Sequence, residues 1–317
     1  MSLEFSFSPN TATQRNIEHL QREQLLLEER RLCELYELTD VMSDAVTELY
    51  SMGMSPEEAF SILSESLNGG VCRTERYGIT KCEQYILPYV DTLSAYDKII
   101  VSRLLCERLS DKGYALLESD FLLSGTAAET FVYVKNAYAD EAYDVFSQDF
   151  ADPRVSYVQS FKEALSSVAL GRASYALLPI EEGYSRLPTV SEMIFNGDFK
   201  IASITPVLGF DGLANMKYAM ISTGFLISGV MADDDRYLEI RIPTDSDTDV
   251  SYALLAARAY GIDVYRINTS VYETDEGRRS YFDVIFKCTG KDYSCLLSYL
   301  TLFTSEFTAV GMYKNIE

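Results

Sequence analysis

Apolar side chains recur at different spacings along this chain, and the changes of spacing divide it into three parts. From residue 11 to about residue 111 they return every three or four positions, which is typical of amphipathic helices. Ser55 followed by Pro56 has the residue types that begin a helix, and Asn68-Gly-Gly70 indicates a turn. We therefore expect a helical first part, with helices over residues 11–39 and 40–51, from residue 55 onward, and over residues 82–90 and 97–109.

The middle of the chain alternates short apolar strands with helices. Ser160 and Glu163 have the spacing of a capping box, and the helix that they begin should end at Gly171. The run Tyr175–Leu178 is too short and too continuously apolar for a helix, so it predicts a buried strand that Pro179 should end. The other elements expected here are a strand over residues 131–134, a helix over 138–146, a helix capped by Thr189 and Glu192, and a strand over 199–205.

Two acidic residues follow the predicted buried strand. Glu181 and Glu182 come directly after Pro179 and Ile180, at the carboxyl end of the strand. Open α/β sheets bind their ligands outside the carboxyl ends of the strands. The pattern therefore predicts a βαβ core with an acidic turn at its mouth.

The last part of the chain has strand spacing again after an acidic linker at residues 231–235. Leu238, Ile240 and Ile242 alternate with polar residues, as in a strand with one buried face. The elements expected after the linker are strand 237–242, helix 250–260, strand 262–272, a charged hairpin at 274–278, strand 281–287, helix 293–302 and strand 310–313. This βαββαβ order is the ferredoxin-like topology.

Composition excludes several classes of partner. The 317 residues carry a formal charge of −21, which repels polyphosphate, so we expect no nucleic-acid binding. No apolar run approaches the ~18 residues that span a membrane, and the N-terminus lacks the segments of a secretory signal. His19 is the only histidine, and the six cysteines are scattered. We therefore expect a cytoplasmic protein with reduced cysteines, without a metal or a cofactor and without membrane association.

The order of motifs between residues 130 and 222 resembles prephenate dehydratase. That family carries a run similar to Val-Pro-Ile-Glu-Asn-Ser, which matches Leu178-Pro-Ile-Glu-Glu-Gly183 and places Glu181 at the family's glutamate. The run comes after a helix of similar length and precedes a strand like Phe199–Thr205. The segment after residue 235 resembles an ACT domain, the usual regulatory companion of this family.

This resemblance implies a fold class that combines α/β and α+β parts. We expect a helical region over residues 1–125, a periplasmic-binding-protein-like α/β lobe over 126–230, and a ferredoxin-like ACT domain over 236–317. Together they would form a divergent and truncated prephenate dehydratase-like protein.

The residues that carry catalysis in that family are changed here. Its Thr-Arg-Phe signature aligns with Met216-Lys217-Tyr218, so a thioether replaces the threonine hydroxyl and a single ammonium group replaces the arginine fork. Its glycine-rich anion loop aligns with residues 135–140, which contain no glycine and offer Lys135 as the only cation. Its second lobe is reduced to Pro206–Ala214. The resemblance therefore implies the ancestry of a dehydratase together with a dismantled dehydratase site.

The ACT-like part implies a ligand and a partner. ACT domains pair edge to edge and bind amino acids at their interface, so we expect a homodimer in which the first helix and second strand of this part face the partner. Asp247, Asp249 and Asn268 are the residues available to a ligand, whereas Tyr252 stands at the family's glycine and would crowd it. A purely structural pairing domain is the alternative.

Three functions remain open from the sequence. The first is a ligand-sensing or regulatory relative of prephenate dehydratase linked to aromatic amino-acid metabolism, with phenylalanine or a precursor as ligand. The second is an active divergent dehydratase, in which Glu181, Thr189, Lys135 or Arg186 has taken over acid or anion-binding roles. The third is a bifunctional enzyme whose N-terminal helices form a chorismate mutase, although the lysine that such a site needs is absent before Lys81. We favour the first.

Overall fold

The computed structural model describes most of the chain. The described residues are 11–67, 93–125, 129–183, 185–208, 216–227, 235–245, 247–274 and 277–314.

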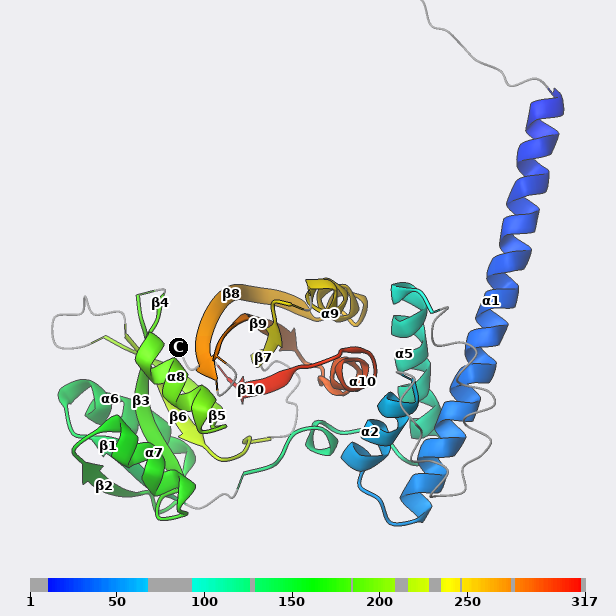
Figure 1. Ribbon diagram of the computed structural model, residues 1–317. Coiled ribbons are helices and arrows are strands. Elements are labelled where there is room, and N and C mark those ends of the chain that lie inside the picture. The colour runs from blue at the N-terminus through cyan, green and yellow to red at the C-terminus, as the bar shows by residue number, and fades with distance from the viewer. Residues whose placement is uncertain are drawn as a thin grey trace, which may run out of the picture.

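The N-terminal part is helical, as predicted. It contains α1 (Thr11–Ser51), α2 (Pro56–Leu67) and α5 (Ala95–Asp111), and the N-terminal part of α1 extends away from the rest of the molecule (Figure 1). The prediction of two helices divided at residues 39 and 40 is wrong, because α1 is continuous over 41 residues. Thr39 donates its hydroxyl hydrogen to Leu35 O at 2.7 Å, so this side chain fits within the helix without interrupting it. The helix predicted over residues 82–90 lies outside the described residues.

Capping boxes begin two of these helices. Glu58 N donates to Ser55 Oγ at 3.2 Å and Ser55 N donates to Glu58 Oε2 at 2.9 Å, which confirms the predicted start before α2. Ser94 and Asp97 form the same reciprocal pair before α5. The three helices pack around their own apolar core, which includes Leu38, Met42, Val46, Phe60, Leu63, Val101, Leu105 and Leu109.

The middle part begins with parallel strands. β1 (Thr130–Val134) pairs in parallel with β2 (Arg154–Val158) on one side and with β3 (Tyr175–Glu182) on the other. Helices α6 (Ala137–Phe146) and α7 (Phe161–Ala169) make the connections. Strand β2 was not predicted. It lies at the edge of the sheet, and its five side chains are exposed or half-buried.

Strand β3 does not end at Pro179, contrary to the sequence prediction. It continues to Glu182, so that Glu181 lies within the strand and not in a turn after it. Pairing with β1 stops at Leu177, so the proline's missing N–H is not required on that side. On the other side, the pairing with β6 (Met216–Ser222) shifts register between Pro179 and Glu181. The proline is thereby accommodated at a bulge.

Helix α8 (Pro188–Asn196) follows the short strand β4 (Ser185–Arg186). The predicted cap of Thr189 and Glu192 is wrong, because the helix begins one residue earlier with Pro188 at its first position and Leu187 as the capping residue. Proline suits that position, since its φ angle is already helical and its N–H is not needed. Strand β5 (Lys200–Val207) confirms the prediction for residues 199–205 and pairs antiparallel with β6.

The C-terminal part has the predicted βαββαβ order. Strand β7 is central and pairs antiparallel with β9 and β10, while β8 pairs antiparallel with β9. The elements are β7 (Asp235–Pro243), α9 (Asp247–Ala259), β8 (Asp263–Thr274), β9 (Gly277–Thr289), α10 (Ser294–Phe303) and β10 (Thr308–Tyr313). Helices α9 and α10 pack on one face of β7, β9 and β10 around Leu238, Ile240, Ile242, Ala253, Val284, Phe286, Leu296 and Leu300.

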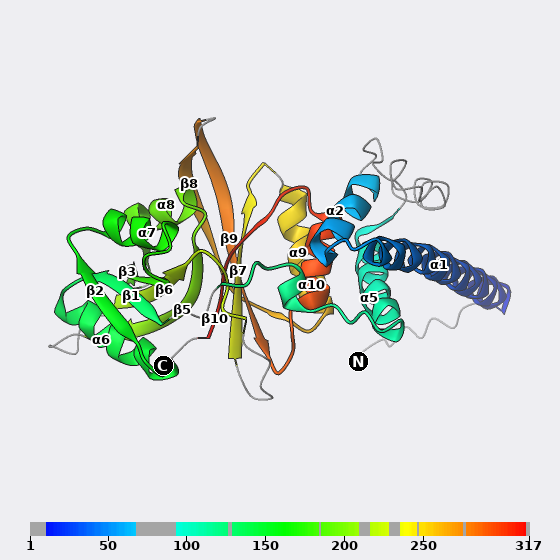
Figure 2. The same cartoon turned by 90° about the horizontal axis from the view of Figure 1, so that it is seen from below.

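The middle and C-terminal parts share one sheet, which the sequence pattern did not predict. Strand β10 pairs in parallel with β5 where Gly311 lies opposite Ile201, and the strand order is β2-β1-β3-β6-β5-β10-β7-β9-β8. Figure 2 shows this sheet passing from the middle part through β5 and β10 into the C-terminal part. In the part of the chain that the structure describes, no helix combines the length and the apolar character needed to cross a membrane.

Gly311 is required for this joint, and replacing it should weaken the fold. A Cβ atom at residue 311 would lie 2.9 Å from Ile201 Cβ and 3.0 Å from the Tyr313 ring, where neither neighbour can easily move. We expect Gly311→Ala to lower the free energy of unfolding by roughly 1–3 kcal/mol, as for other overpacked positions. Urea unfolding measures this, with Thr308→Ala at an exposed position of β10 as the control. Equal stability of the two variants would contradict the prediction.

Candidate functional site

A group of charged side chains lies where the two parts of the sheet meet. Glu181 on β3 is buried, with Arg186 Nε 3.1 Å from its Oε1 and Lys217 Nζ 4.0 Å from its Oε2. Arg266 on β8 donates a hydrogen bond to the same carboxylate. Arg186 also forms an ion pair with Glu239 on β7. We call these five residues the Glu181 cluster.

Local structure explains how the cluster assembles. Glu181 lies opposite Arg186 in the pairing of β3 with β4 and opposite Lys217 in the pairing of β3 with β6. The reversal between β3 and β4 uses Gly183, whose φ of +62° is unfavourable for other residues. Strand β8 curves back toward α8 and β4 (Figure 1) and has a register shift before Arg266, which brings this residue to Glu181.

A second ion pair extends the cluster along β7. Arg241 donates to Asp283 Oδ1 at 2.6 Å and to the Tyr272 hydroxyl at 2.8 Å. Its guanidinium also lies 4.3 Å from the Tyr272 ring centroid and 5.1 Å from that of Phe195 on α8. Such contacts on the flat face of an aromatic ring stabilise a buried cation. The polar face of β7 is thus covered by side chains of α8 and β8.

These neighbours fix the protonation state of Glu181. Burial alone would raise its pKa, but the hydrogen bond from Arg266 and the charges of Arg186, Arg266 and Lys217 together hold the pKa below its ordinary value. Burial, reinforced by the charge of Glu239, raises the pKa of the Tyr313 hydroxyl well above its usual range, and that hydroxyl donates to Glu239 at 3.0 Å. Glu181 is therefore a carboxylate near neutral pH and is unsuited to donate a proton there.

The cluster has little room for a ligand. One cavity beside Glu181 and Arg266 and another beside Arg186 and Arg241 each have a volume of about 10 Å³. That space is enough for about one water molecule. We therefore interpret the Glu181 cluster as a structural connection and not as a binding pocket.

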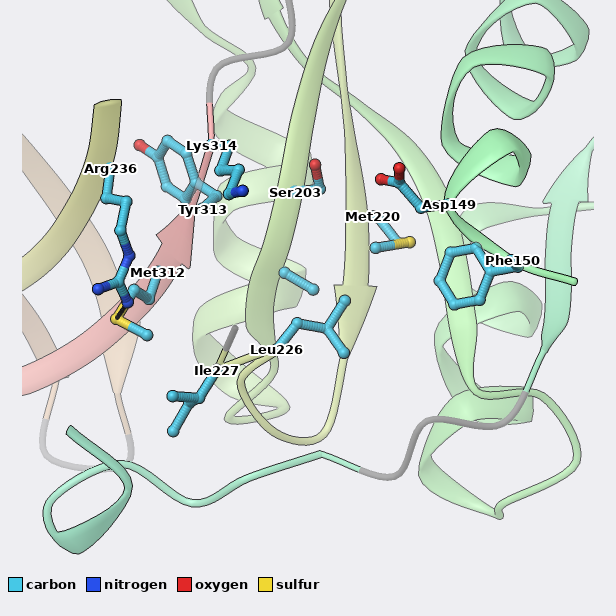
Figure 3. Close-up of a pocket in the computed structure, with 11 residues that line it drawn as sticks. Asp149, Phe150, Ser203, Met220, Leu226, Ile227, Arg236, Met312, Tyr313 and Lys314 are labelled. Atoms are coloured by element: carbon cyan, nitrogen blue, oxygen red, sulfur yellow. Dashed lines mark hydrogen bonds between the residues drawn. The ribbon is translucent and has the colours of Figure 1, made fainter. Parts of the chain in front are cut away.

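A larger cavity lies on the opposite face of the sheet (Figure 3). Its volume is about 560 Å³, within the range of small-molecule pockets. Strands β5, β6, β7 and β10 form one wall, and residues 149–150 and 226–227 complete it. The lining residues are Asp149, Phe150, Ala202, Ser203, Met220, Leu226, Ile227, Arg236, Met312, Tyr313 and Lys314.

A bulge explains part of this wall. The pairing of β5 with β6 shifts register between Ile201 and Ser203, and both Ala202 and Ser203 line the cavity. Two consecutive strand residues would ordinarily face opposite sides of a sheet, and a bulge relaxes this rule. Because both side chains are small, they leave space that larger residues would fill.

The polar groups of the cavity differ in their partners. The Arg236 guanidinium is buried and binds the Glu118 carboxylate through both terminal nitrogens, with Nη1 2.9 Å from Oε1. Glu118 also accepts a hydrogen bond of 2.9 Å from Tyr293 N, at the start of α10. The charge of Arg236 is therefore balanced, and Lys314 is the other cation of the lining. In Figure 3, Arg236, Met312 and Lys314 lie on one side and Asp149 and Phe150 on the other.

The structure brings together only some of the residues selected from the sequence. Glu181, Arg186 and Lys217 meet, but Lys135 is exposed, with its ammonium 4.7 Å from the Tyr157 ring centroid. None of them lines the large cavity, and neither do the other family-equivalent positions. Met216 lies opposite Glu182 and Val207, and the Tyr218 hydroxyl donates to Asn136 Oδ1 at 3.4 Å.

The candidates of the C-terminal part do not gather into one site either. Asp249 accepts a hydrogen bond of 3.1 Å from Ser305 N, which is a structural contact at the end of α10. Tyr252 is exposed on α9, and Asn268 lies opposite Asp283 on the edge strand β8. The side chain of Asp247 is outside the described part. Among the described residues, no group of three or more acidic, cysteine or histidine side chains is arranged to hold a metal ion.

Sequence reasoning missed the residues that complete both sites. Arg266 stands alone among Val264, Tyr265 and Ile267 in an apolar strand, and an isolated charge in such a run is a signal of a buried partner. The lining residues Met220, Leu226 and Met312 carry no such signal, because each has the apolar character of an ordinary core residue.

Comparisons with known proteins give structural similarities of low identity. No family model matches the chain, and no curated protein does. Prephenate dehydratase from Streptococcus mutans is similar with a TM-score of 0.47 and 13% identity, over 60% of this chain and 100% of that one. Prephenate dehydratase from Arthrobacter aurescens in complex with L-Phe is similar with a TM-score of 0.43 and 11% identity, over 58% of this chain and 90% of that one. A quorum quenching acylase is similar with a TM-score of 0.43 and 15% identity, over 59% of this chain and 96% of that one. TM-scores below 0.5 assign neither a function nor site residues to this chain.

Removing the charge of Glu181 should destabilise the protein in a pH-dependent way. Glu181→Gln removes the carboxylate that pairs with Arg266 and one of the two carboxylates that pair with Arg186. Breaking a buried ion pair costs about 3 kcal/mol or more. Because the folded pKa of Glu181 is lowered, its contribution is present above the ordinary glutamate pKa of about 4.3 and is lost as the pH falls toward the folded value. The difference in the free energy of unfolding between wild type and Glu181→Gln should therefore become smaller in acid.

Urea unfolding at pH 7 and at pH values below about 4.3 measures this difference. Glu182→Gln is the matched control, since Glu182 is the exposed neighbour on the same strand and should change stability by less than about 0.5 kcal/mol. Two outcomes would refute the structural role of Glu181. One is an equal loss of the free energy of unfolding in the two variants at pH 7, and the other is a loss in Glu181→Gln that does not change with pH.

Proposed function

We propose that this protein binds a small aromatic amino acid or a closely related carboxylate in the 560 Å³ cavity and serves as a ligand sensor and not as an enzyme. The cavity itself carries the proposal. Met220, Leu226 and Met312 offer an adaptable apolar surface for a ring, since methionine side chains are flexible and make favourable contacts with aromatic faces. This agrees with the link to aromatic amino-acid metabolism that the sequence resemblance implies.

The charges of the lining favour a zwitterion over a dianion. Arg236 is paired with Glu118, and Lys314 is the other cation of the lining and suits one carboxylate. Asp149 contributes a carboxylate that suits an ammonium group. Prephenate carries two carboxylates and no ammonium group, so together with Asp149 it would bring three carboxylates beside the single lysine of the lining. Buried charge that is not compensated is unfavourable. Phenylalanine and tyrosine fit this balance better.

The positions at which the resembling family performs catalysis support a sensor over an enzyme. Met216 has no hydroxyl to protonate a leaving group, and Glu181 is held as a carboxylate by Arg186, Lys217 and Arg266. General acid catalysis requires a group that carries a proton near the working pH. Glu181 instead connects the strands around it through its ion pairs.

Ligand binding should be visible as thermal stabilisation. We expect L-phenylalanine or L-tyrosine to raise Tm, since a ligand at 100 times its Kd stabilises the folded state by about 2.7 kcal/mol. Leu226→Trp should fill the cavity and abolish the shift, whereas Leu170→Trp, at an exposed position just after α7 and outside the lining, should retain it. Differential scanning fluorimetry of the three proteins with phenylalanine, tyrosine, phenylpyruvate and prephenate measures the shifts.

The same proteins should not convert prephenate to phenylpyruvate, and Met216→Thr should not create that activity. If no compound raises Tm of the wild type, or if Tm of Leu226→Trp rises by the same amount as that of the wild type, binding in the cavity is contradicted. Prephenate turnover at an ordinary enzymatic rate of about 10 per second would instead support a divergent dehydratase.

We further infer that two copies of the chain pair through the outer edge of β8 and the adjacent α9. Within the described residues β8 pairs with β9 alone, so its other edge offers unpaired backbone groups over a strand of 12 residues. Large apolar side chains are exposed on these two elements: Tyr252, Val264, Tyr265, Ile267 and Val271. An exposed apolar edge of this kind favours addition of a further strand.

A charge on this edge should therefore prevent pairing. We expect light scattering to give a dimer mass for the wild type at micromolar concentration and a monomer mass for Ile267→Glu. Val155→Glu is the matched control, because Val155 is exposed on β2 at the opposite edge of the same sheet. A wild-type monomer, or dissociation caused by Val155→Glu alone, would contradict pairing through β8.

A further inference from the structure

Two cysteines from distant parts of the chain meet where the helical part contacts the C-terminal part. Cys106 lies on α5, and Cys295 lies in the first turn of α10. Both side chains are half-buried, and the Cys106 thiol donates a hydrogen bond to the Cys295 sulfur. The two thiols are therefore neighbours where α5 contacts α10.

Small residues allow the two helices to approach closely beside these thiols. Ser102 Oγ lies 3.4 Å from Cys295 O and 3.5 Å from Ser298 Oγ. Ser102 precedes Cys106 by one helical turn, and Ser298 comes nearly one turn after Cys295. Serine side chains at both surfaces keep the backbones near one another, which a disulfide between two helices requires.

Cys295 is the more acidic of the two thiols. The hydrogen bond from Cys106 lowers the pKa of Cys295, and the charge of Arg103 acts in the same direction, against burial and the charges of Asp292 and Glu107. Its position near the N-terminus of α10 also favours a thiolate. The same hydrogen bond, together with burial, raises the pKa of Cys106 well above its ordinary value.

Solvent reaches both sides of the pair. One surface hollow of about 390 Å³ is lined by Arg103, Tyr260, Lys291 and Cys295, and a second of about 380 Å³ is lined by Cys106, Ser110, Leu116 and Ser294. Glu107 and Asp292 border both hollows. A small oxidant can therefore approach either thiol. Cys288, in contrast, is buried at 2% exposure, and burial raises its pKa.

We propose that Cys106 and Cys295 are a reversible redox pair that a hydroperoxide oxidises to a disulfide. The Cys295 thiolate attacks one peroxide oxygen, the O–O bond breaks, and Cys295 becomes a sulfenic acid while hydroxide leaves and takes up a proton as water. Cys106 then attacks the Cys295 sulfur, the S–O bond breaks, and a second water leaves with the Cys106 proton. Two thiols and one hydrogen peroxide give one disulfide and two waters, and a dithiol reductant reverses the change.

The disulfide would tie α5 to α10 covalently. Contacts between the helical part and the C-terminal part would then persist under conditions that separate them in the reduced protein. Closing a long loop between residues 106 and 295 also restricts the unfolded chain, so the oxidised protein should be the more heat-stable form. The pair would make attachment of the helical part responsive to oxidants, independently of whether the large cavity binds a ligand.

Mass spectrometry of the full-length protein after stoichiometric hydrogen peroxide tests this proposal. We expect the loss of two hydrogen atoms, the loss of two titratable thiols, a peptide cross-link between Cys106 and Cys295, and recovery of both thiols with dithiothreitol. Cys106→Ser should accumulate a sulfenic acid on Cys295 that dimedone traps, and Cys295→Ser should form no disulfide. Cys288→Ala and Cys33→Ser are controls that should still form the disulfide between Cys106 and Cys295.

Alkylation of the unmodified wild type provides a measurement that does not depend on the folding of any variant. Iodoacetamide at neutral pH should react with Cys295 faster than with Cys106 or Cys288. A cross-link that involves Cys72 or Cys82, oxidation of Cys295 to a sulfinic acid with Cys106 unchanged, or faster alkylation of Cys106 than of Cys295 would each overturn the proposal.

Discussion

One half-buried guanidinium connects the two halves of the sheet. Arg186 comes from the short strand β4 and lies between Glu181 on β3 and Glu239 on β7. A carboxylate buried without a cation would destabilise the fold by several kcal/mol. Glu239 gains its cationic partner, and Glu181 gains one of its three, only when the middle and C-terminal parts close on each other. This requirement makes the correct junction of the sheet far more stable than an arrangement that leaves the carboxylates unpaired.

The same junction gives the sheet two faces of different character. Strand β7 is buried over nearly its whole length, with Leu238, Ile240 and Ile242 against α9 and α10 and with Glu239 and Arg241 on the opposite side. On the polar side, ion pairs fill the space and leave cavities of about 10 Å³. On the apolar side, small residues on β5 leave the much larger cavity. Ion pairing closes one face, while the other retains room for a ligand.

Glu181 and Lys217, two of the four positions that align with the catalytic residues of the resembling family, belong to the closed face. Glu181 and Lys217 are neighbours in the Glu181 cluster, where Arg266 and Arg186 already satisfy the carboxylate. An acid with a lowered pKa and satisfied hydrogen bonds contributes to stability and is a poor proton donor. The proposed ligand function therefore uses the open cavity, and the proposed thiol chemistry lies at a separate place, where α5 contacts α10.

The sequence by itself determined the elements wherever local chemistry decides them. The capping box of Ser55 and Glu58 and the alternation along residues 237–242 predicted a helix start and a strand, because these signals depend on neighbours within a few residues. It failed at Pro179, where the outcome depends on which partner strand lies beside the proline. The alternation also could not reveal what covers Glu239 and Arg241. Their burial depends on α8 and on the curvature of β8, which brings Arg266 to Glu181 across 85 residues of chain. Only the tertiary structure decided these contacts, since charge pairing over such distances is set by the path of the backbone and leaves no periodic signal in the sequence.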